Sequence, residues 1–215
     1  MRQGERAYAT LLDEIQRGDL APATVLGEVE QAARLGVSRT PLREALTRLE
    51  ADGLVVQRSP RVTVVADLPV SRIRQLFEVR RALEEQAARL AAERGDAATF
   101  AALADEFAEA GVAGLAGEDE VEAYYRLIAR FDVALDAAVA NEFLTQALRT
   151  VRTHLVRVRR LAKDHPDRLE ASVVEHRLIA SAIAARDADL AAHATHVHLH
   201  NALASVLAGL PEGHP

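Results

Sequence analysis

The stretch that decides the fold is Gly36-Val37-Ser38-Arg39-Thr40-Pro41-Leu42-Arg43-Glu44-Ala45-Leu46-Thr47-Arg48-Leu49-Glu50-Ala51-Asp52-Gly53-Leu54. Its apolar residues recur at helical spacing, which predicts a helix that buries one side: Leu42, Ala45, Leu46 and Leu49. Ser38 is placed to cap the start of this helix. Pro41 falls in the first turn, where backbone N–H groups have no partner within a helix.

The opposite side of the same helix carries arginine and threonine. At about 100° per residue, the side chains of four residues lie roughly 120° away from the apolar stripe: Arg39, Thr40, Arg43 and Thr47. A short helix that buries one side and presents arginines on the other suits the major groove of DNA. We interpret it as the recognition helix of a helix-turn-helix.

The composition fits a helical protein of one or two domains. Of the 215 residues, 49% are apolar and only 4% are aromatic, so a core of Leu, Val and Ala is expected. The chain has no cysteine, which excludes disulfides and thiolate metal sites and fits a cytoplasmic protein. No apolar run approaches the roughly 18 residues of a membrane span, and no signal-peptide core is present, so no membrane partner is expected.

The net charge of −6 does not by itself indicate nucleic-acid binding, because bulk electrostatic attraction to DNA needs a basic protein. Any DNA contact must therefore come from a local patch. Residues 34–61 supply one, with arginines that outnumber the acids: Arg34, Arg39, Arg43, Arg48, Arg58 and Arg61.

Turn signals divide the rest of the chain into helices and one hairpin. Two helices are expected at about 8–17 and 27–35, ahead of the recognition helix. Two β-branched runs, 54–57 and 61–65, predict a small hairpin, or wing. Six amphipathic helices follow, at about 71–93, 96–110, 118–140, 141–163, 168–186 and 187–209. The expected fold is mainly α: an N-terminal winged helix-turn-helix, followed by an all-α six-helix bundle.

Several motifs resemble the GntR family of bacterial transcription regulators: Gly18-Asp19-Leu20, the run 34–46 and the run 48–54. The second half resembles the FCD-type effector domain of the FadR subfamily, through Glu78-Val79-Arg80-Arg81-Ala82-Leu83-Glu84 and Glu175-His176-Arg177-Leu178-Ile179. Six helices rather than seven resemble its VanR-like branch. The resemblance implies that residues 1–68 bind DNA and that residues 69–215 bind a ligand and dimerise.

The resemblance further implies that Arg39, Thr40 and Arg43 contact operator bases and phosphates. Arginine suits this role because its guanidinium can donate two hydrogen bonds to O6 and N7 of guanine. The full predicted DNA-binding set is Arg34, Ser38, Arg39, Thr40, Arg43, Thr47, Arg58 and Arg61. Two departures bear on operator choice, because Val29 stands where the family usually has an arginine and the wing tip lacks the usual glycine.

Many members of the subfamily hold a divalent metal with one aspartate and three histidines, and the metal then binds a carboxylate effector. His176 and His198 match two of these histidines; Asp132 stands at the position of the remaining one, and Ile128 at that of the aspartate. One interpretation is a Zn, Ni or Mn site with Asp132, His176 and His198 as ligands. The other is a metal-free pocket in which these side chains, with His154, hydrogen-bond to a ligand or to one another.

Effector-binding candidates also lie on the predicted helix 141–163. His154 could face the pocket, and Arg152 or Arg157 suits an effector carboxylate because guanidinium matches carboxylate geometry.

The last predicted helix carries four histidines, of which only one set can face a pocket. Three share a face at spacing i, i+3, i+7: His193, His196 and His200. His198 points roughly 160–200° from His196 and His200. The resemblance implies that His198, which has the family's separation from His176, is the one that lines the pocket.

The expected function is a homodimeric, ligand-responsive repressor. Each winged helix reads one half of a palindromic operator, because a two-fold dimer needs two matching half-sites. A small organic acid in the helical domain changes the placement of the reading heads, with a coupling free energy of about 1–3 kcal/mol. The alternatives are a helical metabolite- or metal-binding module, or a metal-dependent enzyme, with little DNA binding. No nucleophile elbow, phosphate-binding loop or HExxH pattern occurs, so an enzyme is not expected.

Overall fold

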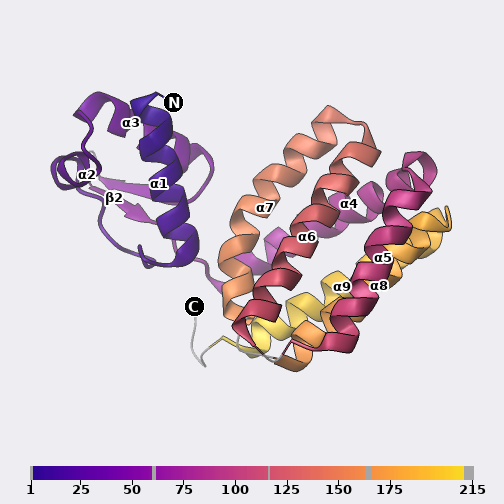
Figure 1. The fold of residues 1–215 in the computed structure, drawn as a ribbon. Helices are drawn as coiled ribbons and strands as arrows, with labels where there is room; N and C mark the ends of the chain where they lie inside the picture. The colour runs from indigo at the N-terminus through magenta and orange to yellow at the C-terminus, as the bar shows by residue number, and fades with distance from the viewer. Residues whose placement is uncertain (1, 60–61, 116, 163–165, 211–215) are drawn as a thin grey trace. The chain divides into compact units, whose positions relative to one another are not determined.

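The computed structural model describes residues 2–59, 62–115, 117–162 and 166–210, drawn as a ribbon in Figure 1. The helices of this part are α1 (Gln3–Arg17), α2 (Glu28–Leu35), α3 (Arg39–Ala51), α4 (Val70–Arg94), α5 (Ala97–Ala113), α6 (Glu118–Val139), α7 (Glu142–Ala162), α8 (Pro166–Ala184) and α9 (Ala188–Ala208). The strands β1 (Val55–Ser59) and β2 (Val62–Val65) pair antiparallel. The predicted fold class is confirmed: a helix-turn-helix with a small hairpin, then six helices.

The chain forms two compact units. One comprises residues 1–69 together with 153–157, and the other comprises residues 70–152 and 158–215. Each unit has an apolar core of its own. Within the described residues, none of the helices has the length and hydrophobicity that crossing a membrane requires.

The N-terminal unit is built on α1, α2 and α3. Leu11 and Ile15 of α1 pack in one core with Leu42 and Leu49 of α3. Gly36 ends α2 with φ of +63°, a backbone conformation that strains any residue with a Cβ atom. The tight turn that follows brings α2 and α3 against each other, as a helix-turn-helix requires.

The start of α3 agrees with the sequence in position but not in one contact. The four apolar residues of its stripe are all buried: Leu42, Ala45, Leu46 and Leu49. Ser38 is the N-cap residue and has an extended backbone, but its side chain makes no capping hydrogen bond. The Ser38 carbonyl alone accepts from the helix, from Leu42 N at 3.4 Å. The expected side-chain cap is therefore wrong, although the expected cap residue is right.

Two features near the N-terminus were not predicted. α1 begins at Gln3 rather than near residue 8, and its first turn is closed by Glu5, whose carboxylate accepts a hydrogen bond from Arg2 N at 2.9 Å. The segment 23–26 forms an edge beside β2, with Leu26 N donating to Thr63 O at 2.8 Å. This edge is too short to show the alternation by which a strand is recognised.

The helical unit consists of α4 to α9, which Figure 1 shows as a bundle of long helices. α4 packs against α9 and α6, and α8 packs against α5 and α9. Edge-to-face aromatic contacts join α5 to α6, with ring centroids 6.1 Å apart for Phe100 and Phe131 and 6.3 Å apart for Phe107 and Tyr124. This packing places α4, α6, α8 and α9 around one interior space.

Candidate functional sites

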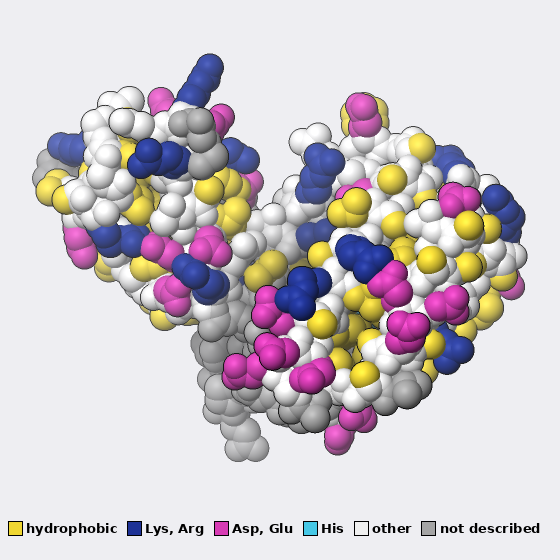
Figure 2. Space-filling model, in the orientation of Figure 1, with side chains coloured by type: hydrophobic (Ala, Val, Ile, Leu, Met, Phe, Trp, Pro, Cys, Tyr) yellow, Lys and Arg dark blue, Asp and Glu magenta, His cyan; other side chains and the backbone are white. Residues whose placement is uncertain are grey.

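The outward face of α3 presents the side chains that the sequence assigns to DNA. Arg39, Thr40, Arg43 and Thr47 are exposed, and the side chains of the two arginines are 59% and 60% accessible. On the face of this unit seen in Figure 2, arginine and acidic side chains lie beside each other. That face therefore carries mixed charges and is not broadly basic.

One acidic residue that the sequence analysis passed over belongs to this surface. Glu28, the first residue of α2, accepts a hydrogen bond at Oε2 from Arg39 Nη2 at 2.9 Å, and at Oε1 from Arg43 Nε at 2.8 Å. These two arginines lower the pKa of the Glu28 carboxyl to about 2, with Arg43 contributing most. The signal that could have identified Glu28 is its position, because it is the first residue of the helix that packs on α3.

The remaining arginines of the predicted patch are placed differently. Arg34 donates two hydrogen bonds to the Glu14 carboxylate on α1, at 2.5 and 2.7 Å, and this pairing raises the Arg34 pKa. Arg34 therefore ties α2 to α1, which does not favour its predicted contact with DNA. Arg48 stacks over the Tyr8 ring, with 3.8 Å between its guanidinium carbon and the ring centroid. Arg58 is exposed on β1, and Arg61 lies outside the described residues.

The helical unit contains a pocket of about 30 Å³. It is lined by Arg80, Glu84 and Ala88 of α4, Phe131, Asp132 and Leu135 of α6, Arg152 of α7, His176 and Ile179 of α8, and Thr195 and His198 of α9. A space of that size holds about two water molecules. The pocket brings together Asp132, Arg152, His176 and His198 from the sequence prediction.

The two pocket histidines are each held by one ring nitrogen. Nδ1 of His198 lies 2.7 Å from Glu175 Oε2, and Nδ1 of His176 lies 2.8 Å from the backbone oxygen of Ser172. Because a carboxylate oxygen only accepts, Nδ1 of His198 carries the proton and its Nε2 is an acceptor. Nδ1 of His176 also contacts the hydroxyls of Tyr124 at 3.0 Å and Ser172 at 3.2 Å. The ring centroids are 4.4 Å apart, so the two imidazoles act on the same end of the pocket.

Burial lowers the pKa of the His198 imidazole, and the nearby Arg80 guanidinium adds to this effect, while the Glu175 carboxylate opposes it. Glu175 also accepts hydrogen bonds from Arg168 and Asn201, at 2.7 Å each. These contacts fix the carboxylate that orients His198. The imidazole therefore stays neutral near physiological pH.

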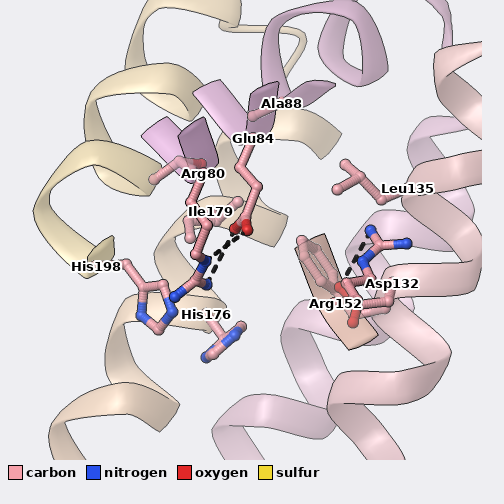
Figure 3. Close-up of a pocket in the computed structure, with 11 residues that line it drawn as sticks. Arg80, Glu84, Ala88, Asp132, Leu135, Arg152, His176, Ile179 and His198 are labelled. Atoms are coloured by element: carbon pink, nitrogen blue, oxygen red, sulfur yellow. Dashed lines mark hydrogen bonds and ion pairs between the residues drawn. The ribbon is translucent and has the colours of Figure 1, made fainter. Parts of the chain in front are cut away.

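A buried arginine that was given no role in the sequence prediction lies beside the histidines. Arg80 is 5% exposed, and its Nε and Nη2 donate to the two oxygens of Glu84 at 2.8 and 3.3 Å. Figure 3 shows the Arg80 guanidinium next to His176 and His198. The run Glu78–Glu84 contains this pair at spacing i, i+4, which is the signal that could have identified it.

Asp132 lies on the opposite side of the pocket, together with Arg152 (Figure 3). Arg152 Nη2 is 3.5 Å from Asp132 Oδ1, and Arg152 Nη1 donates to Asp136 Oδ2 at 2.8 Å. Burial disfavours the charged guanidinium, but the Asp132 and Asp136 carboxylates outweigh it and raise the Arg152 pKa. Arg152 is thus a fixed cation on the pocket wall.

Two predicted effector residues are placed elsewhere. His154 and Arg157, both described, are not among the residues that line this pocket. They fall in residues 153–157, which group with the N-terminal unit, and Arg157 Nη2 donates there to the carbonyl of Ala66 at 2.7 Å.

The histidines of α9 divide as the helix geometry predicts. His198 is buried and lines the pocket, whereas His193 and His200 are exposed. His196 is partly exposed and its Nδ1 lies 2.9 Å from Glu85 Oε1.

The residues that line the pocket bear on the divalent-metal interpretation in opposite ways. The histidine acceptors on α8 and α9 would favour one. Against this, the Arg80 guanidinium already supplies a positive charge beside them, and Asp132 is paired with Arg152 across the pocket. Among residues whose positions are described, no three His, Asp or Glu side chains come together as a metal-binding group. The described residues therefore form an internally ion-paired site.

Comparison with known proteins covers both units. The model of the gntR family of bacterial regulatory proteins matches residues 3–65, and that of the FCD domain matches residues 75–201, more than half of the chain. The chain is 36% identical over 138 residues to the Nta operon transcriptional regulator of Aminobacter aminovorans, a match that covers 64% of this chain and 63% of that protein, under two thirds of its length.

Two further similarities extend over nearly the whole chain. It is 27% identical over 202 residues to the HTH-type transcriptional repressor RspR of Escherichia coli (strain K12), covering 94% of this chain and 88% of that protein. The solved structure of E. coli McbR/YncC shows the same fold, with a TM-score of 0.76 and 20% identity over 97% of this chain and 98% of that one. These matches indicate a transcription regulator and not an enzyme.

Proposed function

Because the chain belongs to the family of bacterial transcription regulators that join a GntR domain to an FCD domain, we propose that it is a ligand-responsive repressor of the FadR subfamily, in its VanR-like branch. It acts in the cytoplasm as a homodimer on a palindromic operator. The name of the RspR relative supports repression as the sign of control. The six helices that follow the hairpin support the branch.

The observation that carries this proposal is the two-sided character of α3. Its apolar stripe is buried in the N-terminal unit, while Arg39 and Arg43 are exposed one turn apart. A helix held by one face offers the other to the major groove, where guanidinium groups read guanine. Thr40, Thr47 and Ser38 complete the proposed contacts of α3, and Arg58 adds one from the hairpin.

For the helical unit we propose a small carboxylate effector and no metal. Arg80 and Arg152 lie on opposite sides of the pocket, and a ligand carboxylate that replaces Glu84 or Asp132 as the partner of either guanidinium needs no metal to hold it. His198 accepts a hydrogen bond through Nε2 from a hydroxyl or protonated group of the ligand, and His176 lines the same end of the pocket. Because about 30 Å³ holds only about two waters, a ligand of more than a few atoms must displace water and separate the helices.

Selection of duplexes from a random pool tests the DNA proposal. The purified protein is expected to enrich a palindrome whose half-sites are about one helical turn, ~34–36 Å, apart, with two chains bound per duplex. Enrichment of no common sequence, or of a site bound by one chain, contradicts the proposal.

Titration of small mono- and dicarboxylic acids into the protein–operator complex tests the effector. One class of acid is expected to release the duplex, and Arg152→Met is expected to keep operator affinity but lose this response. The matched control is Arg149→Met, which removes an exposed arginine from the same helix. Release that survives Arg152→Met places the effector at another site.

A further inference from the structure

The carboxylate of Glu28 joins the two arginines that are proposed to read DNA. Its two oxygens are used separately, Oε2 by Arg39 and Oε1 by Arg43, at 2.9 and 2.8 Å. One residue of α2 thus fixes both side chains of α3. The Glu28 side chain is 27% exposed, less than half the exposure of either arginine, so the shared partner is the most enclosed group of the three.

Both guanidiniums keep N–H donors beyond those that Glu28 uses. Arg43 donates to Glu28 through Nε, and a guanidinium used in this way keeps both Nη groups for a bidentate contact. Arg39 donates through Nη2, which has a second hydrogen, and Nη1 has two more. A guanine can therefore be read while the carboxylate stays bound, because recognition at O6 and N7 needs only two donors.

The charge on Glu28 has a second effect. Its pKa of about 2 keeps it ionised at any physiological pH, so the three side chains carry a net charge of one rather than two. Attraction to phosphate depends on the number of neutralising cations and is the same for every sequence, whereas a bidentate base contact depends on orientation. A shared carboxylate reduces the attraction to phosphate and preserves the orientation that a bidentate base contact needs.

From these observations we propose that Glu28 is the specificity-determining residue of the reading surface. It orients Arg39 and Arg43 for base recognition and suppresses sequence-independent binding of DNA. The inference rests on the proposed function, because it needs α3 to be the element that reads an operator. Glu28 acts through the two arginines and is a positioning residue.

Two substitutions separate orientation from charge. Glu28→Gln removes the charge and weakens both hydrogen bonds. Glu28→Asp keeps the charge, but its side chain is one methylene shorter and cannot hold both arginines in the same way. Glu30→Gln is the matched control, because Glu30 is an exposed acid on the same helix.

Binding of each variant to the selected operator and to a scrambled duplex is measured by fluorescence anisotropy over a range of salt concentrations. For Glu28→Gln we expect stronger binding to the scrambled duplex, a salt slope steeper by about 0.9, and a ratio of specific to non-specific affinity lower by at least about tenfold. For Glu28→Asp we expect an unchanged salt slope and a similar loss of that ratio. Glu30→Gln is expected to change the ratio by less than about twofold, and all variants should keep the thermal midpoint of the wild type.

The outcomes distinguish this inference from its premise. A wild-type protein that selects no sequence overturns the proposed function, and the role of Glu28 falls with it. A selective wild type whose specificity ratio is unchanged by Glu28→Gln or by Glu28→Asp overturns only the role of Glu28. Equal strengthening of specific and non-specific binding in Glu28→Gln, with Glu28→Asp like the wild type, also overturns it, because charge alone then explains the effect.

Discussion

The reading surface and the helical pocket combine arginine with carboxylate in opposite environments. The side chains of Arg39 and Arg43 are 59% and 60% exposed and share one carboxylate. The side chains of Arg80 and Arg152 are 6% and 20% exposed and lie against carboxylates of their own unit. Exposed ion pairs contribute little free energy and exchange partners readily; separating a buried pair is costly. The first arrangement suits a surface that meets many DNA sequences, and the second suits a site that holds its shape until an anion enters.

The largest expected effect comes from the buried pair. Arg80→Met leaves the partly buried Glu84 carboxylate without the Arg80 guanidinium, which is expected to lower the free energy of unfolding by about 3 kcal/mol in urea titrations. Arg126→Met is the control, because Arg126 forms a pair at the same i, i+4 spacing with Glu122 on the surface. That change should cost no more than about 0.5 kcal/mol. Equal losses of unfolding free energy in Arg80→Met and Arg126→Met would contradict the difference between the pocket pair and the surface pair.

Loss of the reading arginines is expected to act on binding rather than on stability. The double substitution Arg39→Ala/Arg43→Ala should weaken operator affinity by about a hundredfold or more, since each bidentate guanine contact contributes strongly to discrimination. Anisotropy titrations against the selected operator measure this. The double variant Arg17→Ala/Arg126→Ala removes the same charge from exposed positions and should retain most of the affinity. Unaffected operator binding by the first double variant contradicts the recognition role of α3.

The stability of the helical unit, which contains the pocket, should depend on pH. The folded pKa of His198 is depressed, so its contribution to stability is complete above the unfolded value of about 6.5 and is lost as the pH falls toward the folded pKa. Glu175, whose pKa is lowered, loses its contribution in the same direction, but only below its unfolded value of about 4.5 and therefore outside the range from pH 8 to pH 5. Urea titrations from pH 8 to pH 5 should therefore show falling stability, and His198→Gln should flatten the curve. A curve of unchanged slope in His198→Gln assigns the dependence to other groups.

The smallest effect is expected from metal ions. A metal ion present at a concentration of about a hundred times its dissociation constant would stabilise the fold by about 2.7 kcal/mol. Such a stabilisation raises the thermal midpoint by several degrees. Because Arg80 lies beside the two histidines, Zn²⁺ or Ni²⁺ added to the purified protein should produce no such shift. The same measurement on Asp132→Ala controls for binding at surface histidines. A shift in the wild type that disappears in Asp132→Ala restores the metal-site interpretation.

Periodic patterns in the sequence predicted most of the architecture. The apolar stripe of α3, the hairpin and the six later helices all follow from spacing and turn residues, because regular helices repeat their environment every few residues. Helix geometry separated His198 from the other three histidines of α9, and the family spacing assigned it to the pocket. The edge at 23–26 did not, because it consists of a few contacts with β2 and has no period of its own.

The charged partners were the part that could not be predicted. Glu28 and Arg80 are ordinary residues of amphipathic helices in the sequence, and their roles depend on which side chains of other helices lie within about 3 Å. Arg34 shows the converse, because membership of a basic run predicted a DNA contact while its guanidinium pairs with Glu14. The sequence shows how many charged residues a segment has, but the packing of the helices determines which of them form ion pairs.

The small size of the pocket has a consequence for how a signal is passed on. A cavity already shaped for its ligand could fill without altering the conformational equilibrium of the protein, and such binding would carry no information. A ligand of the proposed class is larger than the roughly 30 Å³ of this pocket, so on that proposal the pocket must open before the ligand binds. Apparent affinity is then reduced by the open fraction, and that lost affinity is the free energy that shifts the population. On this proposal, an effector that controls DNA binding through the pocket must bind more weakly than its contacts alone would allow.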